Sequence, residues 1–351
     1  MPLQANMVVQ MGILEAVGAT RPASSFVRAL VAISLLLAAT TLSSAWAQAR
    51  TNIPKIGILS FGTPPSGTDP DPDRGVRQGL RDFGYVEGRN IFIERRYAEG
   101  KPDRLAAHAA ELVRLQVDVI LAGGPATREA ARKATSSIPI VTISGVDPVQ
   151  EGWAESLAHP GSNITGLTVT FRELNLKRLE ILKEAFPAIT RVAVLSEYRV
   201  DQQFKQEMDG GARRLGLGLQ FIDVPREEDI DQALTIARQG RAQALIAFAT
   251  NVVVNDRSRL AALAAADRML SISEFPLMAQ AGFLLTYGAD LDDLGRRSIA
   301  QIDKILKGAR AGELPIERPT KFRLIVNLKT AKTLGLTIPQ SLLLRADEVI
   351  Q

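Results

Sequence analysis

KIGILS at Lys55–Ser60 and RVAVLS at Arg191–Ser196 are the two stretches of sequence that set the fold. Both are short aliphatic runs, and each is followed by a loop and then by a longer amphipathic stretch. This order is typical of a strand and a helix in a parallel α/β sheet. Because the pattern begins at KIGILS and begins again at RVAVLS, we predict two successive open α/β sheets, joined near Val169, in place of one larger domain.

The same pattern places further elements around each run. After KIGILS, we expect strands at Asn90–Arg95, Val117–Ala122, Ile138–Ser144 and Ile164–Val169, with helices at Asp73–Phe83, Pro102–Leu115, Thr127–Ser136 and Leu174–Phe186. After RVAVLS, we expect strands at Leu219–Val224, Ala244–Ala249, Leu270–Ser273 and Phe283–Tyr287, with helices at Gln202–Leu215, Glu228–Gln239 and Arg257–Met269. The last part of the chain adds a helix at Leu291–Lys307, an extended segment at Lys321–Asn327 and a helix-like tail at Leu328–Leu334.

The late helix at Leu291–Lys307 is distant from the second set of strands, which indicates that it returns to the first sheet. In that case the chain crosses between two lobes more than once, and several crossings together make a hinge. We therefore expect an N-terminal lobe of residues 53–168 plus 288–320 and a C-terminal lobe of residues 169–287 plus 321–351.

The segment Arg28–Arg50, RALVAISLLLAATTLSSAWAQAR, has the features of an export signal. Basic residues precede the apolar run Ala29–Leu42, and Ala45–Ala47 gives the small-x-small pattern that signal peptidase needs. The run has about 14 residues, fewer than the roughly 20 that span a bilayer, although a membrane anchor or a buried helix remains an alternative. We expect residues 1–47 to be a signal peptide, with cleavage after Ala47 or Ala49.

Composition narrows the class of protein further. The chain has no cysteine, so it has no disulfide and no cysteine for lipid anchoring, and we expect a soluble periplasmic protein that is not a lipoprotein. The net charge is only +4 and the charges are interspersed, which argues against nucleic acid as a partner. The two histidines, His108 and His159, have no second soft ligand nearby, so we expect no metal site and no histidine-based catalysis.

The loop after KIGILS, SFGTPPSG at Ser60–Gly67, is where a cofactor would bind in many folds of this class. It contains no G-x-G-x-x-G that runs directly into a helix, and the chain has no P-loop sequence. We therefore expect no cofactor. The loop instead predicts a surface that lines a ligand, with Phe61 and Thr63 as contacts.

Two further loops of the first half follow predicted strands. In Gly123–Thr127, the glycines let the backbone approach a ligand, and Thr127 can cap a helix whose free N–H groups attract a carboxylate or phosphate. The alternative is a tight turn with an ordinary N-cap. In Ser144–Pro148, Asp147 is either a partner for an ammonium group or simply a turn former.

Polar and aromatic residues also end or follow the strands of the second half, at Glu197 and Tyr198, Thr250 and Asn251, Glu274 and Phe275, and Tyr287 and Asp290. Polar groups that converge on the mouth of a sheet favour a binding site. No Ser-His-Asp triad can be built, and we expect no enzyme. Glu274 with Asp290 remains a formal glycosidase pair, but its surroundings favour binding.

Several stretches resemble one family. They are Ala249–Asn251, Arg268–Ile272, Gly282–Gly288, Lys304–Gly308, Glu313–Glu317, Asn327–Lys332, Leu334–Pro339 and Arg345–Glu348. Together they are similar to the exported ABC transporter substrate-binding proteins of the tryptophan/tyrosine-binding type, over nearly all of Ile53–Ile350. The resemblance implies a type I periplasmic binding protein: two Rossmann-like lobes, a hinge of three crossings and a ligand enclosed between the lobes.

The function that follows is an extracytoplasmic receptor for a small polar solute, such as an amino acid or aromatic compound. It would work as a monomer that delivers the solute to an ABC permease and its ATPase. A sensor subunit that presents the solute to a membrane signalling protein shares these features and stays open. The expected ligand-binding residues are Phe61, Thr63, Pro125, Ala126, Thr127, Asp147, Tyr198, Thr250, Asn251, Glu274 and Tyr287.

Overall fold

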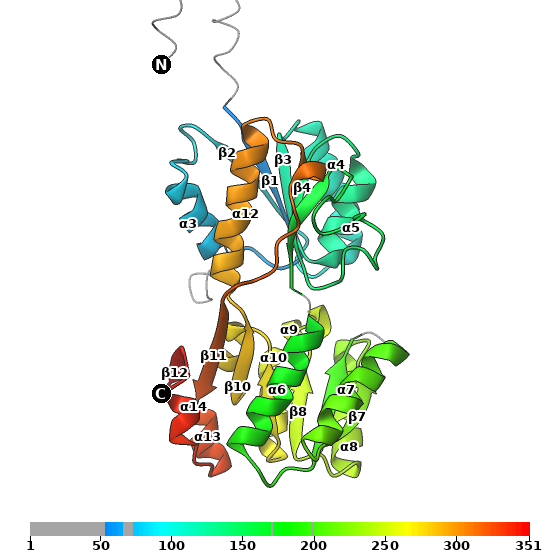
Figure 1. Ribbon diagram of the computed structural model, residues 1–351, viewed down its shortest axis with the longest axis vertical. Helices are drawn as coiled ribbons and strands as arrows, with labels where there is room; N and C mark the ends of the chain where they lie inside the picture. The colour runs from blue at the N-terminus through cyan, green and yellow to red at the C-terminus, as the bar shows by residue number, and fades with distance from the viewer. Residues whose placement is uncertain (1–52, 66–72, 170, 198–199) are drawn as a thin grey trace, which may run out of the picture. The chain divides into compact units, whose positions relative to one another are not determined.

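The computed structural model describes residues 53–65, 73–169, 171–197 and 200–351, with residues 171–173 described through their backbone alone. The predicted export signal at residues 1–47 and the predicted site residue Tyr198 lie outside these ranges. Within these ranges the chain forms a five-stranded sheet and a seven-stranded sheet, with helices between the strands (Figure 1). None of the helices in the same ranges is both long enough and apolar enough to cross a bilayer.

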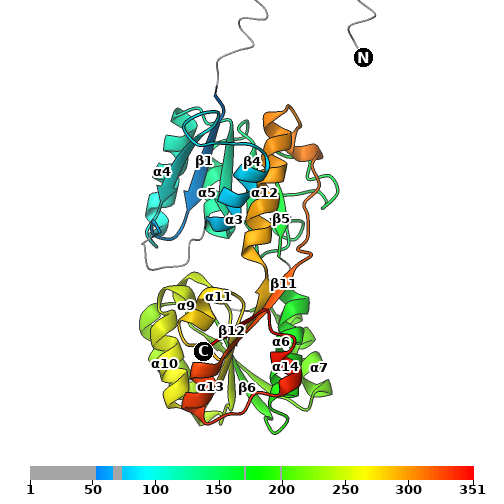
Figure 2. The same ribbon diagram turned by 90° about the vertical axis from the view of Figure 1, so that its left-hand side faces the viewer.

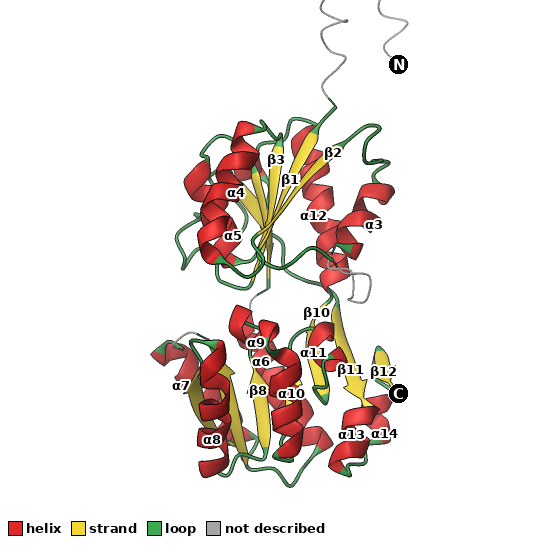
Figure 3. Cartoon of the chain, turned by 180° about the vertical axis from the view of Figure 1, so that it is seen from behind, coloured by secondary structure: helices red, strands yellow, loops and turns green. Residues whose placement is uncertain are grey.

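The first sheet is parallel and has the strand order β2-β1-β3-β4-β5. Its strands are β1 (Lys55–Ser60), β2 (Phe92–Tyr97), β3 (Val119–Gly123), β4 (Ile140–Ser144) and β5 (Ile164–Thr168). Figure 3 shows α4 (Pro102–Arg114) and α5 (Pro125–Ala134) on one face, and α3 (Arg74–Asp82) and α12 (Leu291–Leu306) on the other. Each face buries its own apolar cluster, so α12 belongs to the first sheet despite its late place in the sequence.

The second sheet has the strand order β12-β11-β10-β9-β8-β6-β7. Its strands are β6 (Arg191–Ser196), β7 (Gly218–Asp223), β8 (Ala244–Ala247), β9 (Leu270–Ser273), β10 (Leu285–Ala289), β11 (Phe322–Asn327) and β12 (Glu348–Ile350). Its helices are α6 (Phe171–Ala185), α7 (Gln202–Arg214), α8 (Ile230–Gln239), α9 (Asn251–Asn255), α10 (Arg257–Ala266), α11 (Pro276–Gln280), α13 (Leu328–Leu334) and α14 (Gln340–Leu343). Figure 2 shows α9, α10 and α11 on one side and α6, α7 and α14 on the other, and each side buries one apolar cluster.

The α/β fold class with two sheets is confirmed, with one correction. Strand β11 runs antiparallel to β10, so the second sheet is not purely parallel. The predicted strands at Lys55–Ser60, Arg191–Ser196 and Leu270–Ser273 match β1, β6 and β9.

Some predicted boundaries were wrong by a short distance. Strands β3 and β4 each begin two residues later than predicted. The reason is that the N–H of Val117 donates to Leu112 O at the end of α4, and the N–H of Ile138 donates to Thr135 Oγ1. These two residues therefore finish the preceding turn instead of pairing with a neighbouring strand. The short helices α9 and α11 were not predicted.

The chain passes between the two sheets at three places, which pack against one another. Strand β5 leads into α6, β10 leads into α12, and the segment after α12 leads back into β11. The second and third passages are joined by a hydrogen bond of 3.0 Å from Asp290 N to Lys321 O. One apolar group, which we call the crossing cluster, joins the first passage to the second and consists of Leu167, Val169, Leu174, Ala289 and Leu294.

Helices α3 and α12 touch through their backbones. A Cβ atom at Gly75 would lie 2.3 Å from the carbonyl oxygen of Asp292, so only glycine fits at this contact. An ion pair between Arg74 and Asp292 closes the same end of the interface. The late helix is thereby fixed to the first sheet by close approach as well as by its apolar face.

This close approach predicts opposite effects of alanine at two helical glycines. We expect Gly75→Ala to lower the free energy of unfolding by about 1–3 kcal/mol, because the added methyl group forces the two helices apart. Gly210→Ala on α7 is the matched control, since no atom lies within 4 Å of the added Cβ. The control should raise the free energy of unfolding by about 0.5–1 kcal/mol, because alanine favours the helix. Urea denaturation measures both, and equal effects at the two sites would contradict the close contact.

Candidate functional site

The carboxyl ends of neighbouring strands bring together the predicted residues of the first sheet. Strands β1, β3 and β4 are adjacent in the sheet and parallel, so the residues that follow them share one edge. Phe61 and Thr63 follow β1, Pro125–Thr127 begin α5 after β3, and Asp147 follows β4. The sheet therefore gathers all the predicted residues of the first half of the chain at this edge.

Thr127 does not cap α5, which corrects the prediction from sequence. The helix begins two residues earlier at Pro125, a residue that suits the first helical position because it has no N–H to satisfy. The N-cap is Gly124, whose φ of 96° favours glycine. Thr127 is 1% exposed, and its hydroxyl donates to the carbonyl oxygen of Gly123 at 2.7 Å. The groups that this end of α5 can offer are the N–H groups of its first turn, which have no acceptor within a helix.

Asp147 has a defined role in its own loop. Its Oδ1 accepts hydrogen bonds from the N–H groups of Val149 at 2.9 Å and Gln150 at 3.1 Å. This is the turn-forming geometry that the sequence allowed as one of two roles.

A buried arginine lies behind the same edge of the first sheet. Arg128 is 3% exposed, and its guanidinium donates to Ser144 Oγ at 3.0 Å and lies 5.0 Å from the ring centroid of Trp153. Glu151 Oε2 lies 3.5 Å from Arg128 Nη2. Burial lowers the pKa of Arg128, and the charge of Glu151 opposes that shift. Trp153 is 6% exposed and packs in the core, so its ring is not available to line a ligand site.

The second sheet gathers its predicted residues in the same way. Strands β8, β9 and β10 are adjacent. Thr250 and Asn251 follow β8 at the start of α9, Glu274 follows β9, and Tyr287 lies within β10. The hydroxyl oxygen of Thr250 is buried and has no hydrogen-bond partner in the described part of the chain. The hydroxyl group of Thr250 can therefore still donate and accept a hydrogen bond at the end of β8.

Arg178 of α6 is the central group of this edge, and it was not among the residues predicted from the sequence. Its side chain is 0% exposed. Nε donates to the carbonyl oxygen of Tyr287 at 2.8 Å, Nη1 donates to Asn175 Oδ1, and Nη1 lies 3.3 Å from Glu274 Oε1. Burial lowers the pKa of Arg178, while the charge of Glu274 opposes the shift. A signal was present in the sequence, because Leu174, Arg178 and Leu182 fall on one stripe of the helix at i, i+4 and i+8.

Glu274 is held on both sides of its carboxyl group. It is 4% exposed, and while Oε1 faces Arg178, Oε2 accepts a hydrogen bond from Ala249 N at 2.5 Å. The carboxylate thereby connects the end of β9 to the loop between β8 and α9. This contact places the start of α9, where Thr250 and Asn251 lie.

Tyr287 lies against another aromatic residue. Its ring stacks on that of Phe322, with centroids 6.1 Å apart and an angle of 22° between the planes. Phe322 is the first residue of β11, and Tyr287 also packs against the crossing cluster. The predicted binding residue Tyr287 therefore lies next to the passages between the sheets.

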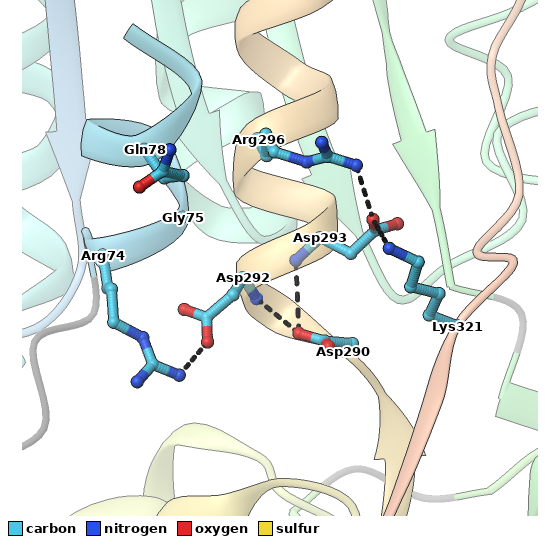
Figure 4. Close-up of a pocket in the computed structure, with 8 residues that line it drawn as sticks. All are labelled: Arg74, Gly75, Gln78, Asp290, Asp292, Asp293, Arg296 and Lys321. Atoms are coloured by element: carbon cyan, nitrogen blue, oxygen red, sulfur yellow. Dashed lines mark hydrogen bonds and ion pairs between the residues drawn. The ribbon is translucent and has the colours of Figure 1, made fainter. Parts of the chain in front are cut away.

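A hollow of about 300 Å³ lies at the start of α12, between α3 and Lys321 (Figure 4). The side chain of Asp290 caps α12 by accepting from Asp292 N at 3.0 Å and Asp293 N at 3.2 Å. Asp293 lies 3.1 Å from Lys321 Nζ. Burial raises the pKa of Asp293, but Lys321 and Arg296 outweigh this and hold it below its usual value. These charges neutralise one another and fix the second and third passages.

No group of histidine, cysteine and carboxylate residues in the described ranges is arranged to hold a metal ion.

Known proteins share this architecture. The sequence model for ABC transporter substrate binding proteins matches residues 65–350. A tyrosine-binding protein of Clostridioides difficile (strain R20291) is 24% identical over 270 residues, which cover 75% of this chain and 76% of that protein. Two solved structures each match 85% of this chain and 99% of their own. They are the ABC domain in complex with L-Trp from Streptococcus pneumonia, with TM-score 0.74 and 24% identity, and the ligand-free, open structure of a substrate binding protein with adhesive properties from Clostridium difficile, with TM-score 0.64 and 23% identity.

The buried pair of Arg178 and Glu274 predicts a strong dependence of each residue on the other. We expect Arg178→Met to lower the free energy of unfolding by about 3–5 kcal/mol, because it leaves the carboxylate buried without a counter-charge. The double variant with Glu274→Gln should regain a large part of this loss, since glutamine carries no charge and still accepts from Ala249 N. Urea denaturation of the two variants measures this. A double variant that is less stable than Arg178→Met would show that the pair is not coupled in this way.

Proposed function

The chain belongs to the ABC transporter substrate-binding protein family, and on this premise we propose that it captures a small solute outside the cytoplasm and delivers it to an ABC importer. Substrate-binding proteins are a non-enzymatic class, and the fold is the type I periplasmic binding protein fold predicted from the sequence. Under this proposal the partners are a membrane permease and its ATPase, and residues 1–47 direct the chain to the periplasm as a soluble monomer.

The observation that carries the proposal is the gathering of polar residues at the carboxyl ends of adjacent strands in both sheets, together with the packed passages between the sheets. In open α/β sheets, ligands bind outside the carboxyl ends of the strands. The proposed lobes are residues 53–168 plus 288–320 and residues 169–287 plus 321–351. The three passages form the proposed hinge.

The proposed solute is an aromatic amino acid. The names of two relatives support this choice, since one is a tyrosine-binding protein and the other was solved in complex with L-Trp. The N–H groups at the start of α5 suit the carboxylate of such a solute, because the first turn of a helix attracts anions. Around the solute we place two groups of residues. They are Phe61, Thr63, Pro125, Ala126, Thr127 and Asp147 from one lobe, and Tyr198, Thr250, Asn251, Glu274 and Tyr287 from the other.

Binding would act through the balance between open and closed forms. A solute that contacts both lobes binds the closed form better and shifts the population towards it, and the permease would recognise that form. A solute that contacted one lobe alone would have equal affinity for the two forms and would shift nothing.

The proposal predicts stabilisation by its ligand. At a concentration of 100 times its dissociation constant, L-tyrosine or L-tryptophan should raise the free energy of unfolding by about 2.7 kcal/mol. A thermal-shift screen of the purified protein against amino acids, small aromatic acids and sugars measures this, with calorimetry of each positive compound. The receptor function would be wrong if no solute class shifted the melting temperature while one of them was chemically converted.

A further inference from the structure

Four carboxylates end or directly follow the parallel strands of the second sheet, and they differ in the partners that they have. They are Glu197 after β6, Asp223 at the end of β7, Glu274 after β9 and Asp290 after β10. All four lie at the carboxyl edge of one sheet, so each is a candidate to bind a cationic group of a solute.

Two of these carboxylates are already engaged. Glu274 lies 3.3 Å from the guanidinium of Arg178 and accepts a hydrogen bond from Ala249 N. Asp290 accepts from two N–H groups in the first turn of α12. An ammonium group would have to displace these partners, and in the case of Glu274 it would leave Arg178 buried without its counter-charge.

Asp223 is unsuitable for a different reason. It is exposed and ends β7, which is the edge strand of the sheet. A carboxylate in water holds a single cation weakly, because solvent screens the attraction.

Glu197 combines partial burial with a free charge. Its Oε2 accepts one hydrogen bond, from Val252 N of α9 at 3.4 Å, and in the described ranges its charge has no cationic partner. Strand β6 pairs with β8, so Glu197 lies beside the loop that carries Thr250. The hydroxyl oxygen of Thr250 is buried without a partner in the described chain and supplies a second acceptor.

Two described carboxylates near the carboxyl edge of the first sheet, Asp147 and Glu151, also have partners already. Asp147 uses Oδ1 to accept two backbone N–H groups of its own turn. Glu151 pairs with the buried Arg128.

We propose that Glu197 binds the protonated amine of the solute, with Thr250 as a second acceptor, and that the site therefore selects amino acids over the same acids without the amine. This inference rests on the proposed function. An ammonium group has three N–H donors, and a bond from it to a partly buried carboxylate is stronger than a neutral hydrogen bond.

The test uses pairs of probes that differ only in the amine. These are L-tyrosine against 3-(4-hydroxyphenyl)propionate, and L-tryptophan against indole-3-propionate, each titrated by calorimetry into the wild-type protein and its variants. We expect the wild type to bind each amino acid at least about 30-fold more tightly than its partner acid. Glu197→Gln should lose about that factor for the amino acids and keep its affinity for the acids, because the amide still accepts from Val252 N.

The matched control is Asp223→Asn. Asp223 pairs in register with Ser196, the residue before Glu197, so the control removes the same charge from the same edge of the sheet. It should leave all four affinities unchanged. Melting temperatures of the unliganded variants verify that each is folded.

Three outcomes would overturn the inference. If Glu197→Gln weakened the amino acids and the acids alike, Glu197 would only cap α9. If Glu274→Gln or Asp147→Asn abolished the preference and Glu197→Gln kept it, the amine would bind at that other carboxylate. If the wild type bound no probe while another solute class stabilised it, the inference would fail and the receptor function would stand. If no solute of any class bound, the proposed function itself would fail.

Discussion

The carboxyl edge of the second sheet depends on one buried cation, the guanidinium of Arg178. Removing an arginine from water costs several kcal/mol, and the structure offsets this with acceptors from Asn175, Glu274 and Tyr287. These acceptors lie on α6, after β9 and on β10, so a single side chain joins a helix to two strand ends. Glu274 in turn fixes the loop that begins α9, because its carboxylate accepts a hydrogen bond from Ala249 N.

The same arginine lies close to the passages between the sheets. Helix α6 begins just after the first passage, and the carbonyl of Tyr287 belongs to the strand that enters the second. Arg178 therefore ties these two passages together on the side of the second sheet. In the proposed receptor, closure would bend the chain beyond this anchor, near Val169, Asp290 and Lys321. The crossing cluster has residues on both sides of that region, and its apolar contacts can slide without breaking a hydrogen bond.

The sequence predicted the parts of this protein that depend on local pattern. Buried parallel strands are continuous apolar runs, so the runs at β1, β6 and β9 and the polar residues that follow them could be located. The direction of β11 could not, because six residues in extended form carry no information about the neighbour with which they pair. Helices as short as α9 and α11 have too few turns to show a periodicity. Arg178 was missed because an arginine in a helix is normally expected at the surface. Only its apolar neighbours one turn away, Leu174 and Leu182, indicate that it faces the core.

The carboxylates of the proposed site show where such prediction ends. In a sequence, Asp147, Glu197 and Glu274 are equivalent acidic residues after apolar runs. In the folded chain, the capacity of each to bind a new cation depends on what it already binds. Breaking a buried ion pair costs about 3–5 kcal/mol. An ammonium group that displaced Arg178 from Glu274 would therefore lose that amount from its free energy of binding. In the proposed receptor, the partly buried carboxylate with the fewest partners inside the protein is then the one best able to bind a cationic group of the solute. That property arises only from tertiary contacts, because it depends on side chains that lie far apart in the sequence.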